Sequence, residues 1–208
     1  MKNLFNTLTT RRTLVASFAT VALAAGLLAL SGCSPKQEAV TAATPSGPKA
    51  TPLDAYDQVA KQTKGFTAGA LMSANTVYVL FDPQCPHCGH LWQATQPLLR
   101  KTKFVWVPVG IVNAKSTPQG AALLAAANPV ELMTAHEASL LAGTGGTSAP
   151  NSIPDDIEKA IKTNTQVFNA LNADSVPMIV AKHAKTGELI THMGSMDTAG
   201  LASFLGVD

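Results

Sequence analysis

The pattern of apolar and polar positions divides the chain into three parts. Residues 1–32 end in a long uncharged apolar run, and residues 33–52 are rich in Pro, Ala, Thr, Ser and Gly. The second part has too little apolar content to fold, which is typical of a flexible tether. From there on, apolar residues recur with the periods of strands and helices. We therefore expect a targeting segment, a tether and one folded domain over residues 53–208.

Within residues 53–208, runs of β-branched and aromatic residues predict strands bounded by Pro, Gly and Asp. The strand that begins at Ser175 has a proline near its start, and Lys185 to Glu188 reads as a hairpin turn. The expected strands are 75–81, 103–111 with a bend at Pro108, 175–181 and 189–192.

Helical spacing fills the segments between these strands. The first helix follows residues 75–81 and contains Pro97, which should kink it. Residues 117–172 are mostly helical, and Ser152 with Asp155 has the spacing of a capping box. The chain should end in a helix over 198–205. The result is an α/β order with a helical insertion between the second strand and the proline-led strand.

Composition and charge then exclude one class of function. Hydrophobic residues make up 46% of the chain and charged residues 13%, so a core is expected. The formal net charge of +2 depends on Lys2, Arg11 and Arg12; without residues 1–32 it becomes −1. Because the folded part has no basic stripe, we expect no binding of nucleic acid.

The targeting segment resembles a lipoprotein signal peptide. Three cationic residues precede the apolar run 14–30, which leads into Leu30-Ser31-Gly32-Cys33. This motif resembles the lipobox of bacterial lipoproteins, which implies lipid attachment to Cys33 and export by the Sec or the twin-arginine route. Ser34 implies sorting to the outer membrane, facing the periplasm. An uncleaved anchor helix remains the alternative, because 17 residues are near the short limit for a membrane span.

The mature chain would keep two cysteines, in the sequence Cys85-Pro86-His87-Cys88. A structural disulfide here would close too short a loop to add much stability. The two cysteines with His87 and His90 are too crowded for a tetrahedral zinc site, and a c-type haem would need His at position 89. We favour a redox dithiol and expect no metal and no separate cofactor.

The position of this motif predicts its chemistry. Cys85 follows a strand and begins a helix, where free N–H groups and the helix dipole stabilise a thiolate. Cys88, one turn further, is placed to resolve a mixed disulfide formed at Cys85. His87 either tunes Cys85 as a cation or is an exposed helix residue; we favour tuning.

The segment from Phe81 to Trp92 strongly resembles the active-site segment of the DsbC/DsbG family of bacterial thiol:disulfide interchange proteins. The resemblance continues through Trp106-Val107-Pro108-Val109-Gly110 and runs on to Val176-Pro177. It implies a thioredoxin fold with a helical insertion. It also implies that Pro177 is a cis-proline facing the dithiol, with the Val176 backbone free to pair with a substrate peptide.

Two features depart from the family. Only the tether and a short helix precede the domain, where the family has a dimerisation domain, so we expect a monomer. Pro86-His87 and Val176 resemble DsbA, which implies tuning of the dithiol toward an oxidant. Val79 stands where thioredoxin and DsbA have a buried acid. We expect Asp82 to form a turn and not to relay protons.

Together these features predict a periplasmic thiol:disulfide interchange oxidoreductase that acts on exported cysteine-containing proteins. Cys85 is the expected nucleophile and Cys88 the resolving cysteine, and a membrane redox partner of unknown identity would restore the pair. The alternatives are a disulfide reductase or isomerase, or a peptide-binding chaperone without turnover.

Overall fold

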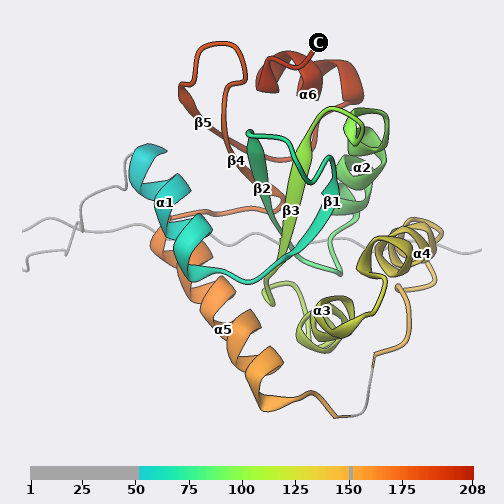
Figure 1. The fold of residues 1–208 in the computed structure, drawn as a ribbon. Helices are drawn as coiled ribbons and strands as arrows, with labels where there is room; N and C mark the ends of the chain where they lie inside the picture. Colours follow the sequence, from blue (N-terminus) through green and yellow to red (C-terminus); the bar gives the residue numbers. More distant parts are fainter. Residues whose placement is uncertain (1–51, 150–151) are drawn as a thin grey trace, which may run out of the picture. The chain divides into compact units, whose positions relative to one another are not determined.

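The computed structural model describes residues 52–149 and 152–208, which form a sheet covered by helices (Figure 1). The signal segment, Cys33 and nearly all of the tether lie outside these residues and stay predictions. The helices are α1 (Pro52–Gln62), α2 (Pro86–Thr95), η1 (Gln96–Leu98, a 3-10 helix), α3 (Ser116–Ala125), α4 (Pro129–Leu141), α5 (Asp155–Ala170) and α6 (Thr198–Leu205). The strands are β1 (Phe66–Gly69), β2 (Thr76–Phe81), β3 (Lys103–Pro108), β4 (Met178–Lys182) and β5 (Leu189–Met193).

The sheet has the strand order β1-β3-β2-β4-β5. β2 runs parallel to β3, whereas β1 and β4 pair antiparallel with their neighbours β3 and β2. Because β2 and β4 are antiparallel, the end of β2 lies beside the start of β4, with Leu80 opposite Met178. This register brings the residues after Phe81 to the residues before Met178, although they are far apart in the sequence.

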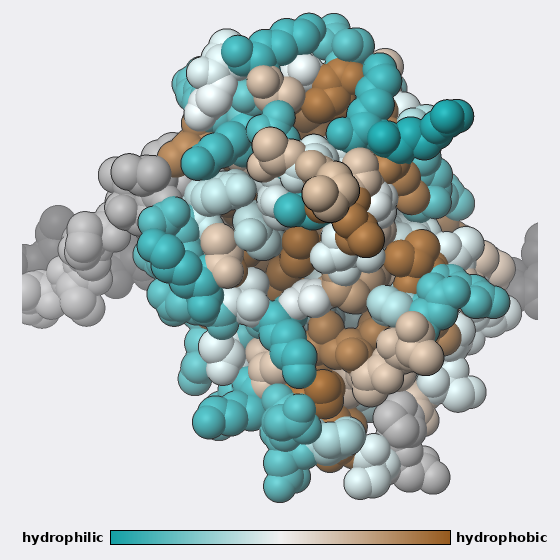
Figure 2. Space-filling view, viewed as in Figure 1, coloured by the Kyte–Doolittle hydropathy of each residue, from teal (hydrophilic) through white to brown (hydrophobic). Residues whose placement is uncertain are grey.

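Helices cover both sides of the sheet (Figure 1). α1 packs on α5 on one side, while α2 contacts α4 and α6 on the other. Trp106 of β3 makes edge-to-face contacts with Trp92 of α2 and with Phe81 of β2. These buried aromatic rings hold α2 against the sheet, since edge-to-face pairs stabilise the fold beyond the effect of burying their area. Hydrophilic residues line the outer side of α5 (Figure 2).

The predicted α/β order and the helical insertion between β3 and β4 are confirmed. The sequence pattern missed β1, whose four residues are too few to show a clear alternation. It placed the end of β3 beyond Pro108, where the strand stops. The predicted capping box is wrong: Pro154 is the N-cap of α5 and no side chain caps the helix. Instead, three acidic residues in its first turn interact favourably with the positive end of the helix dipole.

In the described part of the chain, no helix is both long enough and apolar enough to cross a membrane.

Candidate active site

The turn between β2 and α2 places Cys85 at a helix N-terminus. The Gln84 N–H donates to Asp82 Oδ1 at 2.8 Å, and the Cys85 N–H donates to the Asp82 carbonyl at 3.0 Å. Cys85 is the N-cap of α2 with an extended backbone, and no side chain caps the helix. Pro86 at the first helical position loses no hydrogen bond there. The backbone N–H groups of His87 and Cys88 in the first turn therefore lie close to the Cys85 sulfur.

Asp82 also ties this turn to the end of β3. Its Oδ2 accepts hydrogen bonds from the backbone N–H groups of Ile111 at 2.7 Å and Val112 at 2.9 Å. The carboxylate is fully buried, and its partners are all backbone amides. This agrees with the expectation that Asp82 builds a turn.

The dithiol lies against the start of β4. The Val176–Pro177 peptide bond is cis, and both residues are buried. The Cys85 sulfur lies 3.4 Å from the Val176 carbonyl oxygen, to which it donates a hydrogen bond when protonated, across 91 residues of sequence. The structure thus brings the predicted groove residues to the predicted nucleophile.

The two thiols, which are free, differ in their surroundings. Cys85 is 7% exposed and Cys88 is 0% exposed. A hydrogen bond from the Cys88 thiol, with further contributions from the backbone N–H groups of Cys88 and His87 and the charge of His87, lowers the pKa of Cys85 to about 6. Burial, together with the neighbouring Cys85 sulfur, raises the pKa of Cys88 well above its usual value. Near neutral pH, Cys85 is therefore the thiolate and Cys88 the thiol.

Sequence reasoning missed Glu137, a buried acid in α4. Its side chain is 1% exposed, and neither carboxylate oxygen has a hydrogen-bond partner. Burial, followed by the charges of Cys85 and Asp82, raises its pKa to about 8. A signal was available, because Met133, His136 and Glu137 share the buried face of α4 at helical spacing.

His136, beside Glu137 in α4, holds the dithiol turn to a distant loop. Its Nδ1 accepts the Thr147 N–H at 3.1 Å, so Nε2 carries the proton and donates to the Pro83 carbonyl at 2.7 Å. Burial lowers the pKa of His136, which keeps the ring neutral. Gln84 strengthens this link by donating to the Gly145 carbonyl at 3.0 Å. The loop that contains Gly145 and Thr147 is thus hydrogen-bonded to the dithiol turn.

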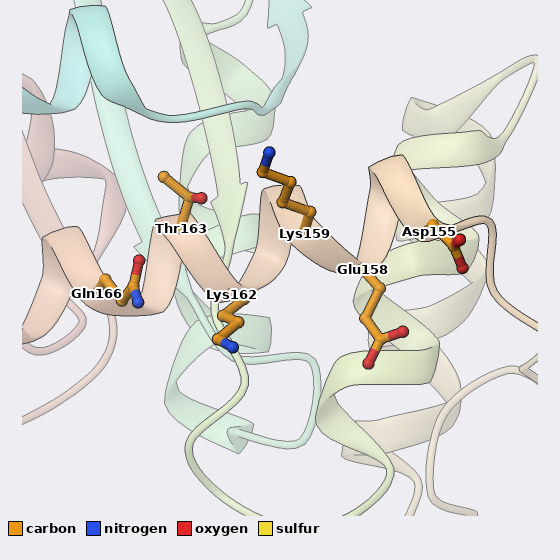
Figure 3. A pocket seen from close by; sticks show the side chains of 6 residues that line it. All are labelled: Asp155, Glu158, Lys159, Lys162, Thr163 and Gln166. Atoms are coloured by element: carbon orange, nitrogen blue, oxygen red, sulfur yellow. The ribbon is translucent and has the colours of Figure 1, made fainter.

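A surface hollow elsewhere is unrelated to the dithiol. Its lining side chains all come from α5 and none is a cysteine (Figure 3). They are Asp155, Glu158, Lys159, Lys162, Thr163 and Gln166. Within residues 52–149 and 152–208, no cluster of three or more His, Cys, Asp or Glu side chains could hold a metal ion.

Comparison with known proteins adds to this geometry. No family model matches the chain. It is 28% identical over 152 residues to the thiol:disulfide interchange protein DsbG of Pseudomonas aeruginosa, covering 72% of this chain and 58% of that protein. It is 30% identical over 105 residues to DsbG of Escherichia coli, and this match covers 50% of this chain and 42% of that protein. The chain therefore spans less than two thirds of either relative.

Among solved structures, the chain is similar to the catalytic domain of ScsC from Proteus mirabilis. The TM-score is 0.57 at 16% identity, and the match covers 73% of this chain and 92% of that domain. At this level of identity the similarity concerns the fold. It confirms the predicted thioredoxin fold with a helical insertion.

The fold and the position of the two cysteines together define a protein with the thioredoxin fold and a Cys-x-x-Cys pair at a helix N-terminus. Within this class, the two DsbG relatives confirm the resemblance to the DsbC/DsbG family of thiol:disulfide interchange proteins.

Proposed function

We propose that this protein is a thiol:disulfide interchange oxidoreductase that acts on cysteine-containing exported proteins. The observation that carries the proposal is the asymmetric dithiol. Cys85, with its lowered pKa, lies at the N-terminus of α2 beside the Val176 carbonyl and is slightly exposed, whereas Cys88 is completely buried.

In the reduced enzyme, the Cys85 thiolate attacks a substrate disulfide and one substrate sulfur leaves as a thiolate. Cys88 then attacks the mixed disulfide, so that the Cys85–Cys88 disulfide forms and the second substrate sulfur is released. In the oxidised enzyme, a substrate thiolate attacks the Cys85 sulfur and the steps run in reverse. The redox couple is the protein's own, with no separate cofactor.

The direction we propose in the cell is oxidation of substrate thiols. A thiolate that is stabilised in the reduced enzyme favours the reduced form and so raises the reduction potential. The lowered pKa of Cys85 supports this direction, as does the DsbA-like Pro86-His87 pair. We expect a potential nearer the about −120 mV of DsbA than the about −270 mV of thioredoxin.

Exposed apolar side chains support a protein substrate. Ile111 and Val112 are 40% and 49% exposed, and their backbone N–H groups bond to Asp82 in the dithiol turn. Met193 is 43% exposed, and the next residue, Gly194, donates its N–H to the Pro177 carbonyl at 2.8 Å. Exposed apolar residues thus lie on two segments that are bonded to the dithiol turn and to the cis-proline, and exposed apolar residues of this kind favour binding of unfolded or extended chains.

The proposed location is the periplasm, and two relatives named as DsbG support it. Lipid attachment at Cys33, an outer-membrane location, a monomeric state and a membrane redox partner are parts of the same proposal.

Insulin reduction with dithiothreitol tests the activity. We expect wild type to accelerate the reaction, and Cys85→Ser and Cys88→Ala to lose turnover. A peptide-binding chaperone would suppress insulin aggregation equally in all three proteins, and that result would overturn the proposal. Equilibration of the Cys85–Cys88 pair with glutathione then gives the potential. A value near that of thioredoxin would favour a reductase.

A further inference from the structure

The buried side of the dithiol holds an acid that the proposed thiol chemistry does not yet use. Glu137 is 1% exposed, and both of its carboxylate oxygens lack hydrogen-bond partners. An ionised carboxylate without partners is costly in the interior, whereas a protonated one is tolerated. Glu137 is therefore a group that can hold or release a proton inside the protein.

The carboxyl of Glu137 faces the backbone of α2 directly beside the dithiol. A side-chain carbon built on Gly89 would lie 2.7 Å from Glu137 Oε2. Gly89 follows Cys88 in α2, so the missing side chain at position 89 leaves room for this carboxyl next to the resolving cysteine. The electrostatic coupling agrees, because the charge of Glu137 raises the pKa of Cys88 and the charge of Cys85 raises that of Glu137.

Few other titratable groups face Glu137. The segments around α4 supply Cys85, Cys88 and the hydrogen-bonded Asp82, while β1 and α3 carry no titratable side chain. α2 also carries His87 and His90, whose side chains are exposed. His136 of the same helix is neutral and is bonded to Pro83 and Thr147. The charges of Cys85 and Asp82 thus act on Glu137, and the charge of Glu137 acts in turn on Cys88.

We infer that Glu137 is the acid–base group of the resolving cysteine, an inference that rests on the proposed interchange activity. When Cys88 attacks the mixed disulfide, its proton passes to the Glu137 carboxylate through a bridging water or after the carboxyl turns toward the sulfur, because the two side chains are not hydrogen-bonded in the structure. The Cys85–Cys88 disulfide forms, the bond between Cys85 and the substrate breaks, and the substrate sulfur leaves as a thiolate. In the opposite direction, Cys88 leaves as a thiolate and takes its proton from Glu137.

The charge on Cys85 differs between the two chemical steps, and this difference changes the pKa of Glu137. While Cys85 is a thiolate, burial and, after it, the charge of Cys85 keep Glu137 protonated near neutral pH. Formation of the mixed disulfide removes the charge of Cys85, so the pKa of Glu137 falls and a larger fraction of Glu137 is ionised and can accept a proton. Glu137 thus becomes a base at the step in which Cys88 must lose a proton.

Single-turnover kinetics with glutathione disulfide separate the two chemical steps. In Glu137→Gln we expect the first step, formation of the mixed disulfide at Cys85, to keep the wild-type rate at neutral pH. Resolution by Cys88 should slow by about 100-fold, the usual size of an acid–base contribution. The matched control is Glu131→Gln, which removes an exposed acid from the same helix and should resolve at the wild-type rate.

Three further readouts exclude a merely structural effect. The wild-type resolution rate should reach a plateau with rising pH, whereas that of Glu137→Gln should keep rising until Cys88 itself ionises. Glu137→Asp should recover part of the rate. In the reduced wild type, the infrared band of a protonated carboxyl should disappear as the pH rises through about 8, and the glutamine variant should lack this band.

The possible failures are distinct. If wild type forms no mixed disulfide, the proposed function itself is overturned. If wild type turns over and Glu137→Gln resolves at the same rate with the same pH profile, the inference on Glu137 is overturned while the function stands. Should Glu137→Gln not fold, the wild-type infrared titration decides: the absence of a carboxyl band that titrates near pH 8 overturns the inference.

Discussion

Two buried acids lie near the dithiol, and their surroundings differ in one respect. Asp82, in the turn before Cys85, accepts three backbone hydrogen bonds, from residues 84, 111 and 112. Glu137, in α4 beside Cys88, accepts none. Both are almost completely buried, at 0% and 1% exposure.

Hydrogen bonding, and not burial, separates the roles of these two acids. Amide donors stabilise the ionised form of a carboxylate in the interior, and their hydrogen bonds hold the carboxylate in place. Without donors, burial favours the protonated acid and leaves its proton available for chemistry. Asp82 therefore stabilises the turn before Cys85. In our proposal, Glu137 transfers a proton at the interface of α2 with α4.

The first way to test this contrast is Asp82→Ala, for which we expect the largest effect. The substitution leaves three backbone N–H groups without their acceptor, and each buried unpaired group costs about 1–3 kcal/mol. We expect a loss of about 3–5 kcal/mol in the free energy of unfolding. Urea denaturation measures it, and Asp82→Asn, which keeps one acceptor oxygen, should lose less. A loss below about 1 kcal/mol would contradict a structural role.

Glu137→Gln should raise the free energy of unfolding, in contrast to Asp82→Ala, and the size of the increase should depend on pH. The folded pKa of Glu137, about 8, lies above its unfolded value, so the folded state holds a proton that the unfolded state releases. The stability contributed at low pH is lost as the pH rises from about 4.5 to about 8. The glutamine variant avoids this loss.

Urea denaturation of the reduced proteins at several pH values measures the difference. We expect wild type and Glu137→Gln to be similar near pH 5 and the variant to be more stable by about 1–3 kcal/mol at pH 8.5. Cys85 acts in the other direction in both proteins, because its lowered pKa adds stability as the pH rises from about 6 to 9. A constant difference across this range would show that Glu137 does not titrate in it.

The sequence predicted the dithiol and the turn around it, but it did not predict the buried acid Glu137. Cys85, Cys88, Val176 and Pro177 could be found because local motifs and a family resemblance mark them. Glu137 could not be assigned to the site in this way, since its place beside Cys88 depends on how α4 packs on α2. Only the buried face shared by Met133, His136 and Glu137 gave a hint. Likewise β1 was missed because an edge strand of four residues depends on its partner β3.

A third prediction concerns the reactivity of Cys85. Iodoacetamide should label Cys85 with a midpoint at about pH 6, and Cys88 should stay unlabelled at neutral pH. Because Glu137 is protonated below about pH 8, Glu137→Gln should leave this midpoint unchanged. Rates of labelling followed by mass spectrometry measure both values. A midpoint above pH 8 in wild type would contradict the stabilised thiolate and the proposed oxidant.

The smallest effect is expected for His87, on the surface side of the dithiol. Its side chain is exposed, and its charge is the last of the contributions that lower the pKa of Cys85, after the Cys88 thiol and the backbone N–H groups. Water weakens the attraction between an exposed cation and a thiolate, so His87→Ala should raise the labelling midpoint of Cys85 by less than about one pH unit. His90→Ala, an exposed histidine one turn further along α2, is the control and should shift it less. A shift of about two units would mean that the imidazolium, and not the Cys88 thiol and the helix N-terminus, stabilises the thiolate.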